Sequence, residues 1–149
     1  MIAKERANKV HEEYPYTGVD WIYELLDYLG ILYFEEEMDR VPSLYLVVDG
    51  KPAIIVDKLE SSARKRELIA HELAHHFFHI GNGILNKKRN PLLASRDERR
   101  AEVFALYLLV PEERLNKLIN VIDPPSLEEL ADEFGVTVEF MAKRLEEGF

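Results

Sequence analysis

The amino-acid sequence predicts an α+β fold, in which a small antiparallel sheet with a hairpin packs on a helical core. Two observations support this prediction. Helical patterns occupy the chain before and after one short region rich in strand-forming residues, between positions 31 and 56. Within that region, the β-rich segments 44–48 and 53–56 flank Asp49-Gly50, a dipeptide typical of tight hairpin turns. A further strand is predicted over residues 31–34.

The helices are predicted from apolar periodicity and from residues that start or stop a helix. In residues 19–29, apolar side chains share one helical face, and Gly30 ends the segment. Ser61 or Ser62 can cap a helix that runs to residue 80 and stops at Gly81. The predicted helices cover residues 2–13, 19–29, 62–80, 95–110, 111–120, 126–134 and 137–147.

The breaks between these helices divide the chain. Residues 81–94 contain Gly-Asn-Gly and an Asn-Pro step and are predicted to form a loop. Asp123-Pro124-Pro125 is a second break, and Gly135 joins the last two helices. We therefore expect a principal domain over residues 1–122 and a C-terminal helical segment, 123–149, that packs on it and is similar to a helix-turn-helix.

Composition excludes several classes of protein. The formal net charge is −9, and the short basic runs 64–66 and 87–89 are expected to be solvated, so nucleic-acid binding is not expected. The absence of cysteine excludes disulfides, thiolate nucleophiles and cysteine-bound metals. No apolar run is long enough for a membrane span and the charged N-terminus is unlike a secretory signal, so we expect the cytoplasm. The oligomeric state stays open.

Four of the five histidines lie between positions 71 and 79. His71 and His75 are one helical turn apart, so both rings project from one face and can bind one zinc ion. Glu72 follows His71, and in the His-Glu-x-x-His pattern that carboxylate serves as the general base of a zinc peptidase. Apolar flanks would bury this helix, and buried polar groups need a partner such as a metal. The alternative is a set of histidines satisfied within the core.

The other histidines have weaker functional arguments. His76 and His79 fit packing at least as well as a role in the site, and the isolated His11 is expected at the surface. An oxyanion donor is not identifiable, and Tyr107 and His76 are candidates without geometric support.

A third ligand is needed, because catalytic zinc sites usually take three protein ligands and leave a fourth position open. No histidine follows the cluster, so we expect a carboxylate. Glu98 and Glu102 lie one turn apart on the next helix, where like charges repel unless a cation relieves them. We assign Glu98 as the ligand and Glu102 as the acceptor of a hydrogen bond from a ligand imidazole, with the reverse assignment open. Glu98 also fits a capping box that starts at Ser95 and needs no metal.

These segments together resemble the ImmA/IrrE metallopeptidase family. The resemblance is carried by His71-Glu72-Leu73-Ala74-His75, Glu98-x-x-Ala101-Glu102-x-Phe104-Ala105 and Leu108-Leu109-Val110-Pro111. It implies a zincin-like core with His71, His75 and Glu98 on zinc and Glu72 as the base. Where the family commonly has Asn or Asp, this chain has Glu102. Some members cleave helix-turn-helix repressors, so the resemblance implies a regulatory zinc endopeptidase with a protein substrate.

Other functions stay open. The Ala131-x-x-x-Gly135 pattern is similar to a DNA-binding helix-turn-helix, although the last helix offers only Lys143 and Arg144 as basic residues. The chain could also be a partner-binding module with a non-catalytic zinc site, and manganese or iron could occupy the same ligands. If the chain is a peptidase, we expect a substrate strand to pair with an edge of the sheet near residues 44–56.

Overall fold

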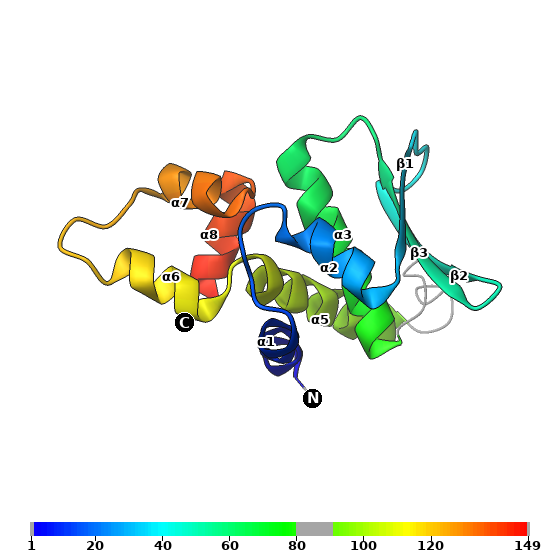
Figure 1. Ribbon diagram of the computed structural model, residues 1–149, viewed down its shortest axis with the longest axis horizontal. Helices are drawn as coiled ribbons and strands as arrows, with labels where there is room; N and C mark the ends of the chain where they lie inside the picture. The colour runs from blue at the N-terminus through cyan, green and yellow to red at the C-terminus, as the bar shows by residue number, and fades with distance from the viewer. Residues whose placement is uncertain (1, 80–90, 149) are drawn as a thin grey trace.

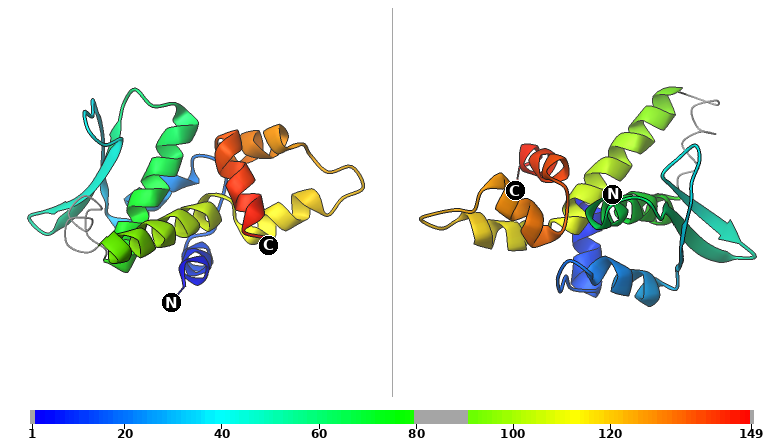
Figure 2. Two further views of the ribbon diagram at one scale, coloured as in Figure 1. Left: turned by 180° about the vertical axis from the view of Figure 1, so that it is seen from behind. Right: turned by 90° about the horizontal axis from the view of Figure 1, so that it is seen from above.

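The computed structural model describes residues 2–79 and 91–148. Its elements are α1 (Ala3–Glu13), α2 (Trp21–Leu29), β1 (Leu32–Glu36), β2 (Ser43–Val48), β3 (Lys51–Asp57), α3 (Ser62–Phe78), α5 (Pro91–Leu109), α6 (Glu112–Ile119), α7 (Leu127–Phe134) and α8 (Val138–Glu146). Helices α3 and α5 lie in the middle of the molecule, with the sheet at one end and α6 to α8 at the other (Figure 1). The views from behind and from above agree with this order (Figure 2). Within the described ranges, every helix is too short or too polar to cross a bilayer.

The central strand of the sheet is β3, with β1 and β2 on either side. β2 and β3 pair antiparallel, in the register that places Ser43 opposite Val56. Asp49 and Gly50 form the turn with φ angles of 52° and 78°. Positive φ at both central residues matches the twist of a two-residue hairpin, and Asp-Gly adopts it readily. The predicted hairpin and the α+β class are therefore confirmed.

One strand pairing differs from the prediction. β1 pairs with β3 in parallel, so the sheet is mixed and the predicted antiparallel arrangement holds only for β2 and β3. After the hairpin, β3 runs in the direction opposite to β2 and lies between β2 and β1. β1 runs in the same direction as β3, so these two strands pair in parallel. The composition of a short strand carries no information about which neighbour it joins, so the sequence pattern could not reveal this pairing.

The packing of α3 against α5 forms the part of the core that supports the site. Ser61 caps the start of α3, and its hydroxyl accepts a hydrogen bond from the backbone N–H of Arg64. Both helices bury alanines among larger apolar side chains, and small side chains let two helices approach closely. The buried apolar residues of the pair are Leu68, Ile69, Ala70, Leu73, Ala74, Ala101, Phe104, Ala105, Leu106, Tyr107, Leu108 and Leu109.

Two predicted boundaries around this pair are wrong. α5 begins at Pro91, so the loop predicted over 81–94 is incorrect in its last four residues, while 81–90 lie outside the described residues. The Asn-Pro step was interpreted as a loop, although proline is favourable in the first turn of a helix, where its missing N–H costs nothing. α3 ends at Phe78 instead of residue 80, because His79 has a left-handed backbone with φ of 54°.

The C-terminal helices α7 and α8 are joined at Gly135, as predicted. Ser126 and Glu129 form a capping box at the start of α7, and the Thr137 hydroxyl caps α8. The buried guanidinium of Arg144 donates to the carbonyl oxygen of Val110 at 2.9 Å. The Arg144 bond holds α8 against the residue that follows α5.

The tight turn at Gly135 generates a prediction about stability. Gly135 and Gly30 both have left-handed backbones, with φ of 65° and 73°, which costs a non-glycine residue about 1–2 kcal/mol. At Gly135 an added Cβ would also lie 2.9 Å from the Cβ of Val19, whereas nothing lies within 4 Å at Gly30. Gly135→Ala should therefore lower the free energy of unfolding more than Gly30→Ala does, as measured by urea titration. Equal losses would contradict the contact with Val19.

Candidate metal centre

A cleft of about 950 Å³ runs along one face of α3. Its walls come from the start of β2, from α5 and from α8, so elements far apart in the sequence enclose it. The residues that line it include Ser43, Leu44, Tyr45, Glu67, His71, Glu72, His75, Glu98, Arg99, Glu102, Phe140 and Lys143. Two of these, Phe140 and Lys143, lie on α8, and α5 and the start of β2 contribute further polar groups. The site is thus an open groove and not an enclosed cavity.

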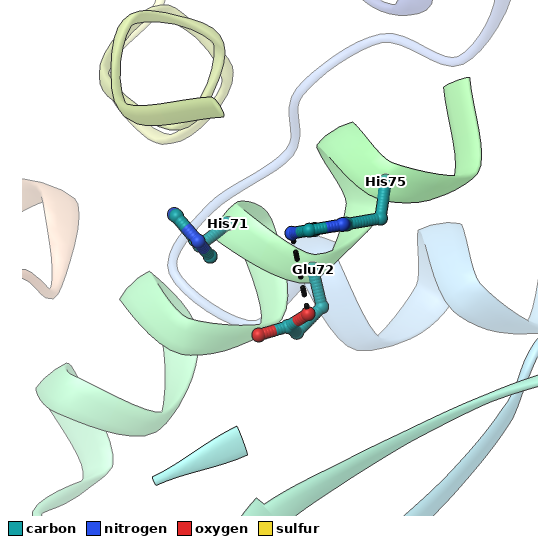
Figure 3. A group of neighbouring side chains, drawn as sticks. All are labelled: His71, Glu72 and His75. Carbon is teal, nitrogen blue, oxygen red and sulfur yellow. Dashed lines mark ion pairs between the residues drawn. The ribbon is translucent and has the colours of Figure 1, made fainter. Parts of the chain in front are cut away.

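Three side chains on α3 converge at the floor of the cleft (Figure 3). One donor atom from each of His71, Glu72 and His75 can be chosen such that all lie within 4.8 Å of one another. The Nε2 atom of His75 lies 3.7 Å from Oε1 of Glu72, and both side chains are more than nine-tenths buried. The positions i, i+1 and i+4 on one helix therefore bring two imidazoles and a carboxylate close together, as the sequence predicted.

Glu98 approaches this group from α5. Its Oε2 atom lies 3.7 Å from Nε2 of His71. Two ligands of one tetrahedral zinc ion, with bonds of about 2.1 Å, have donor atoms roughly 3.4 Å apart, so this separation suits a shared ion. The competing explanation of Glu98 by a capping box is wrong, because Ser95 lies inside α5 and not at its start.

Glu102 has different neighbours from those predicted. Its carboxylate lies 3.5 Å from a guanidinium nitrogen of Arg99 and 3.2 Å from Nζ of Lys143. Glu102 lies one helical turn after Glu98, and its side chain faces α8. Among the described residues, its ion-pair partners are Arg99 and Lys143. The charge of Glu102 is thereby balanced without a metal, and its role as an acceptor for a ligand imidazole stays a prediction.

The two guessed oxyanion donors have other contacts. The hydroxyl of Tyr107 donates to the carbonyl oxygen of Glu147, and its buried ring lies under the guanidinium of Arg144. Nδ1 of His76 lies 2.9 Å from the hydroxyl of Tyr45, and burial lowers the pKa of His76, with nearby His79 and Arg6 adding to the effect. Only the Tyr45 ring of this pair lines the cleft.

The surface position predicted for His11 is wrong. The ring is half-buried and stacks on Trp21 with 4.8 Å between centroids. Its Nε2 atom lies 3.3 Å from the carbonyl oxygen of Tyr107, and burial lowers the pKa of His11. His11 therefore belongs to the aromatic packing around α1 and lies away from the cleft.

Two polar residues of the cleft were missed by the sequence analysis. Glu67 is buried, and its Oε2 accepts a hydrogen bond of 2.7 Å from the backbone N–H of Thr137. Its position four residues before His71 places it on the same helical face, a signal that was available in the sequence. The hydroxyl of Ser43 donates to Oε2 of Glu72 at 2.6 Å, and no local pattern indicates that contact.

Comparison with known proteins agrees with this geometry. Residues 26–146 match the peptidase family model described as the IrrE N-terminal-like domain. The chain belongs to this family. A relative, Metallopeptidase ImmA of Bacillus subtilis (strain 168), is 25% identical over 130 residues, which cover 87% of this chain and 77% of that protein. The ImmA/IrrE resemblance is therefore confirmed. Membership of a metallopeptidase family implies a metal, for which imidazole nitrogens and a carboxylate oxygen are suitable donors.

The donor group predicts the metal content of the purified protein. The parent protein should contain about one divalent metal ion per chain by elemental analysis, because two imidazoles converge in the cleft and the Glu98 carboxylate lies beside one of them. His75→Ala should lose most of it. His79→Asn is the matched control, since it removes an exposed imidazole outside the cleft while Asn tolerates the left-handed backbone. Loss of metal in the control alone would contradict the assignment.

Proposed function

We propose that the protein is a zinc-dependent endopeptidase and that its substrate is a protein, namely a transcriptional repressor or regulator. The observation that carries the proposal is the convergence of His71, Glu72 and His75 at the floor of an open cleft, with Glu98 facing them from α5. Membership of a metallopeptidase family and the name of the relative support the reaction class. The family resemblance, and not the geometry, supports a regulatory substrate.

In this proposal each residue has a separate role. His71, His75 and Glu98 hold the ion, and all three present donors that zinc accepts. Zinc bound there would supply Lewis acidity toward the peptide carbonyl and toward water. Glu72 accepts the proton of the attacking water and delivers it to the leaving amine, as general base and then general acid. The Glu72 side chain is buried between its own helix and Ser43 of β2, which keeps the carboxylate in place while the substrate enters from the open side.

An extended peptide fits the walls of the cleft. β2 is an edge strand of the sheet within the described residues, and its Ser43, Leu44 and Tyr45 line the cleft. An edge strand offers unpaired backbone groups with which an extended segment can pair. On the opposite wall, Phe140 and Lys143 of α8 would contact substrate side chains. This arrangement favours a flexible segment of a protein as the substrate.

The DNA-binding alternative has less support from the same arrangement. α8, which would be the recognition helix, packs against α5 and turns Phe140 and Lys143 toward the cleft. Lys143 is already paired with Glu102, and Arg144 is buried. A recognition helix needs free donors for phosphates and base edges. Peptide cleavage measured together with zinc content distinguishes a peptidase from a partner-binding module with a non-catalytic zinc site. The cytoplasmic location stays a prediction.

Glu72→Gln should abolish peptide hydrolysis and leave bound zinc unchanged. The amide keeps the size of the side chain but cannot accept the proton of water. Cleavage of a mixture of fluorescence-quenched peptides, together with elemental analysis, measures both effects. Glu113→Gln is the control, because Glu113 is exposed on α6 and far from the cleft walls. Equal cleavage by Glu72→Gln and parent would contradict the role of the base, and a zinc-loaded parent without any cleavage would favour the non-catalytic module.

Substrate binding should slow amide exchange in β2. In the zinc-loaded Glu72→Gln protein, a peptide that the parent cleaves should protect amides within Ser43–Val48, because an added strand forms hydrogen bonds with the edge. Exchange in β1, the other edge strand, is the internal control and should stay the same. Unchanged exchange in β2, or equal protection of both edges, would count against pairing at this edge.

A further inference from the structure

The carboxylate of Glu72 has two oxygens in different surroundings. Oε1 lies 3.7 Å from Nε2 of His75, on the side where the donor atoms converge. Oε2 accepts the hydrogen bond of 2.6 Å from the hydroxyl of Ser43, on the side of the sheet. The two oxygens belong to one planar group, so the bond that Ser43 makes to one of them fixes the orientation of the other toward His75.

We propose that Ser43 is a positioning residue that orients Glu72 for proton transfer, an inference that rests on the proposed peptidase function. Ser43 and Glu72 are each 7% exposed, so water has little access to replace the hydroxyl. An ionised carboxylate only accepts hydrogen bonds, and the serine hydroxyl therefore donates. A buried, charge-assisted bond of this length holds the rotamer of the acceptor more firmly than solvent does.

The backbone around Ser43 is itself fixed. Ser43 lies opposite Val56 in the β2–β3 ladder, and the backbone N–H of Asp57 donates to the carbonyl oxygen of Pro42 at 2.8 Å. Two residues further along β2, Tyr45 faces the same side and lies at hydrogen-bonding distance from His76 of α3. The strand that we expect to bind substrate is thus also the strand that supports the base.

The inference is tested with a matched pair of substitutions. Ser43→Thr and Ser43→Val have nearly the same volume and differ in the hydroxyl, and Ser43→Ala removes the hydroxyl without adding volume. Ser62→Ala is the control, because Ser62 is exposed in the first turn of α3 and outside the cleft. The measurements are kcat and KM on the fluorescence-quenched peptide that the parent cleaves fastest, and zinc per chain.

We expect kcat to fall by about 10- to 100-fold in Ser43→Val and Ser43→Ala, the range typical when the hydrogen-bond partner of a metal-site residue is removed. KM and zinc content should stay close to the parent values, and Ser43→Thr should retain most of kcat. Equal kcat in Ser43→Thr and Ser43→Val would overturn the inference, since the hydroxyl would then be irrelevant. A fall confined to KM or to zinc content would overturn it as well.

A readout without catalysis uses the metal-free protein. Ser43→Ala should lower the urea midpoint of unfolding in the parent background and lower it much less in a Glu72→Ala background, because the hydrogen bond has already gone. Equal shifts in both backgrounds would overturn the contact. A parent that cleaves no peptide overturns the proposed function and with it the role of Ser43 in proton transfer, whereas active Ser43→Val overturns the role of Ser43 alone.

Discussion

The close packing of α3 against α5 is the constraint on which the site depends. α3 buries Glu67, Glu72 and His75 together with its apolar residues, so it carries polar groups into a region with little water. Such burial is unfavourable unless each group finds a partner. Ser43 of β2 donates to Glu72, and the backbone N–H of Thr137 at the start of α8 donates to Glu67. Glu98 of α5 lies beside His71, which is less buried than these groups. The cleft thus lies where three separate elements meet the polar face of one helix.

The C-terminal helices are integrated into this arrangement. The carboxylate of Glu67 accepts a hydrogen bond from the backbone N–H of Thr137, the N-cap of α8. Arg66 donates to the carbonyl oxygen of Gly135 at 3.0 Å. Both bonds involve side chains of α3 that lie about one turn before His71. At the other side, the ion pair between Lys143 and Glu102 joins α8 to α5. A segment that is similar to a helix-turn-helix in sequence therefore serves as a wall of the cleft.

The sequence predicted those features that depend on helical periodicity. The spacing of His71, Glu72 and His75 determines their common face once α3 exists, and the Glu98 contact followed from the need for a carboxylate ligand. Features that depend on packing between distant elements were not predictable: the cations around Glu102, the parallel pairing of β1, and the hydroxyl of Ser43. The error at Pro91 has a local cause, since Asn-Pro occurs both in loops and at the start of helices.

The register of the β2–β3 hairpin determines which side chain of β2 faces Glu72. Side chains alternate between the two faces of a strand, so a slip of one residue between β2 and β3 would turn Ser43 away from α3. Pro42 or Leu44 would take its place, and neither side chain can donate a hydrogen bond. A misaligned molecule would retain its imidazoles but leave Glu72 unsupported. Under the role proposed for Ser43, errors in sheet assembly would therefore yield molecules with intact metal donors and slower turnover.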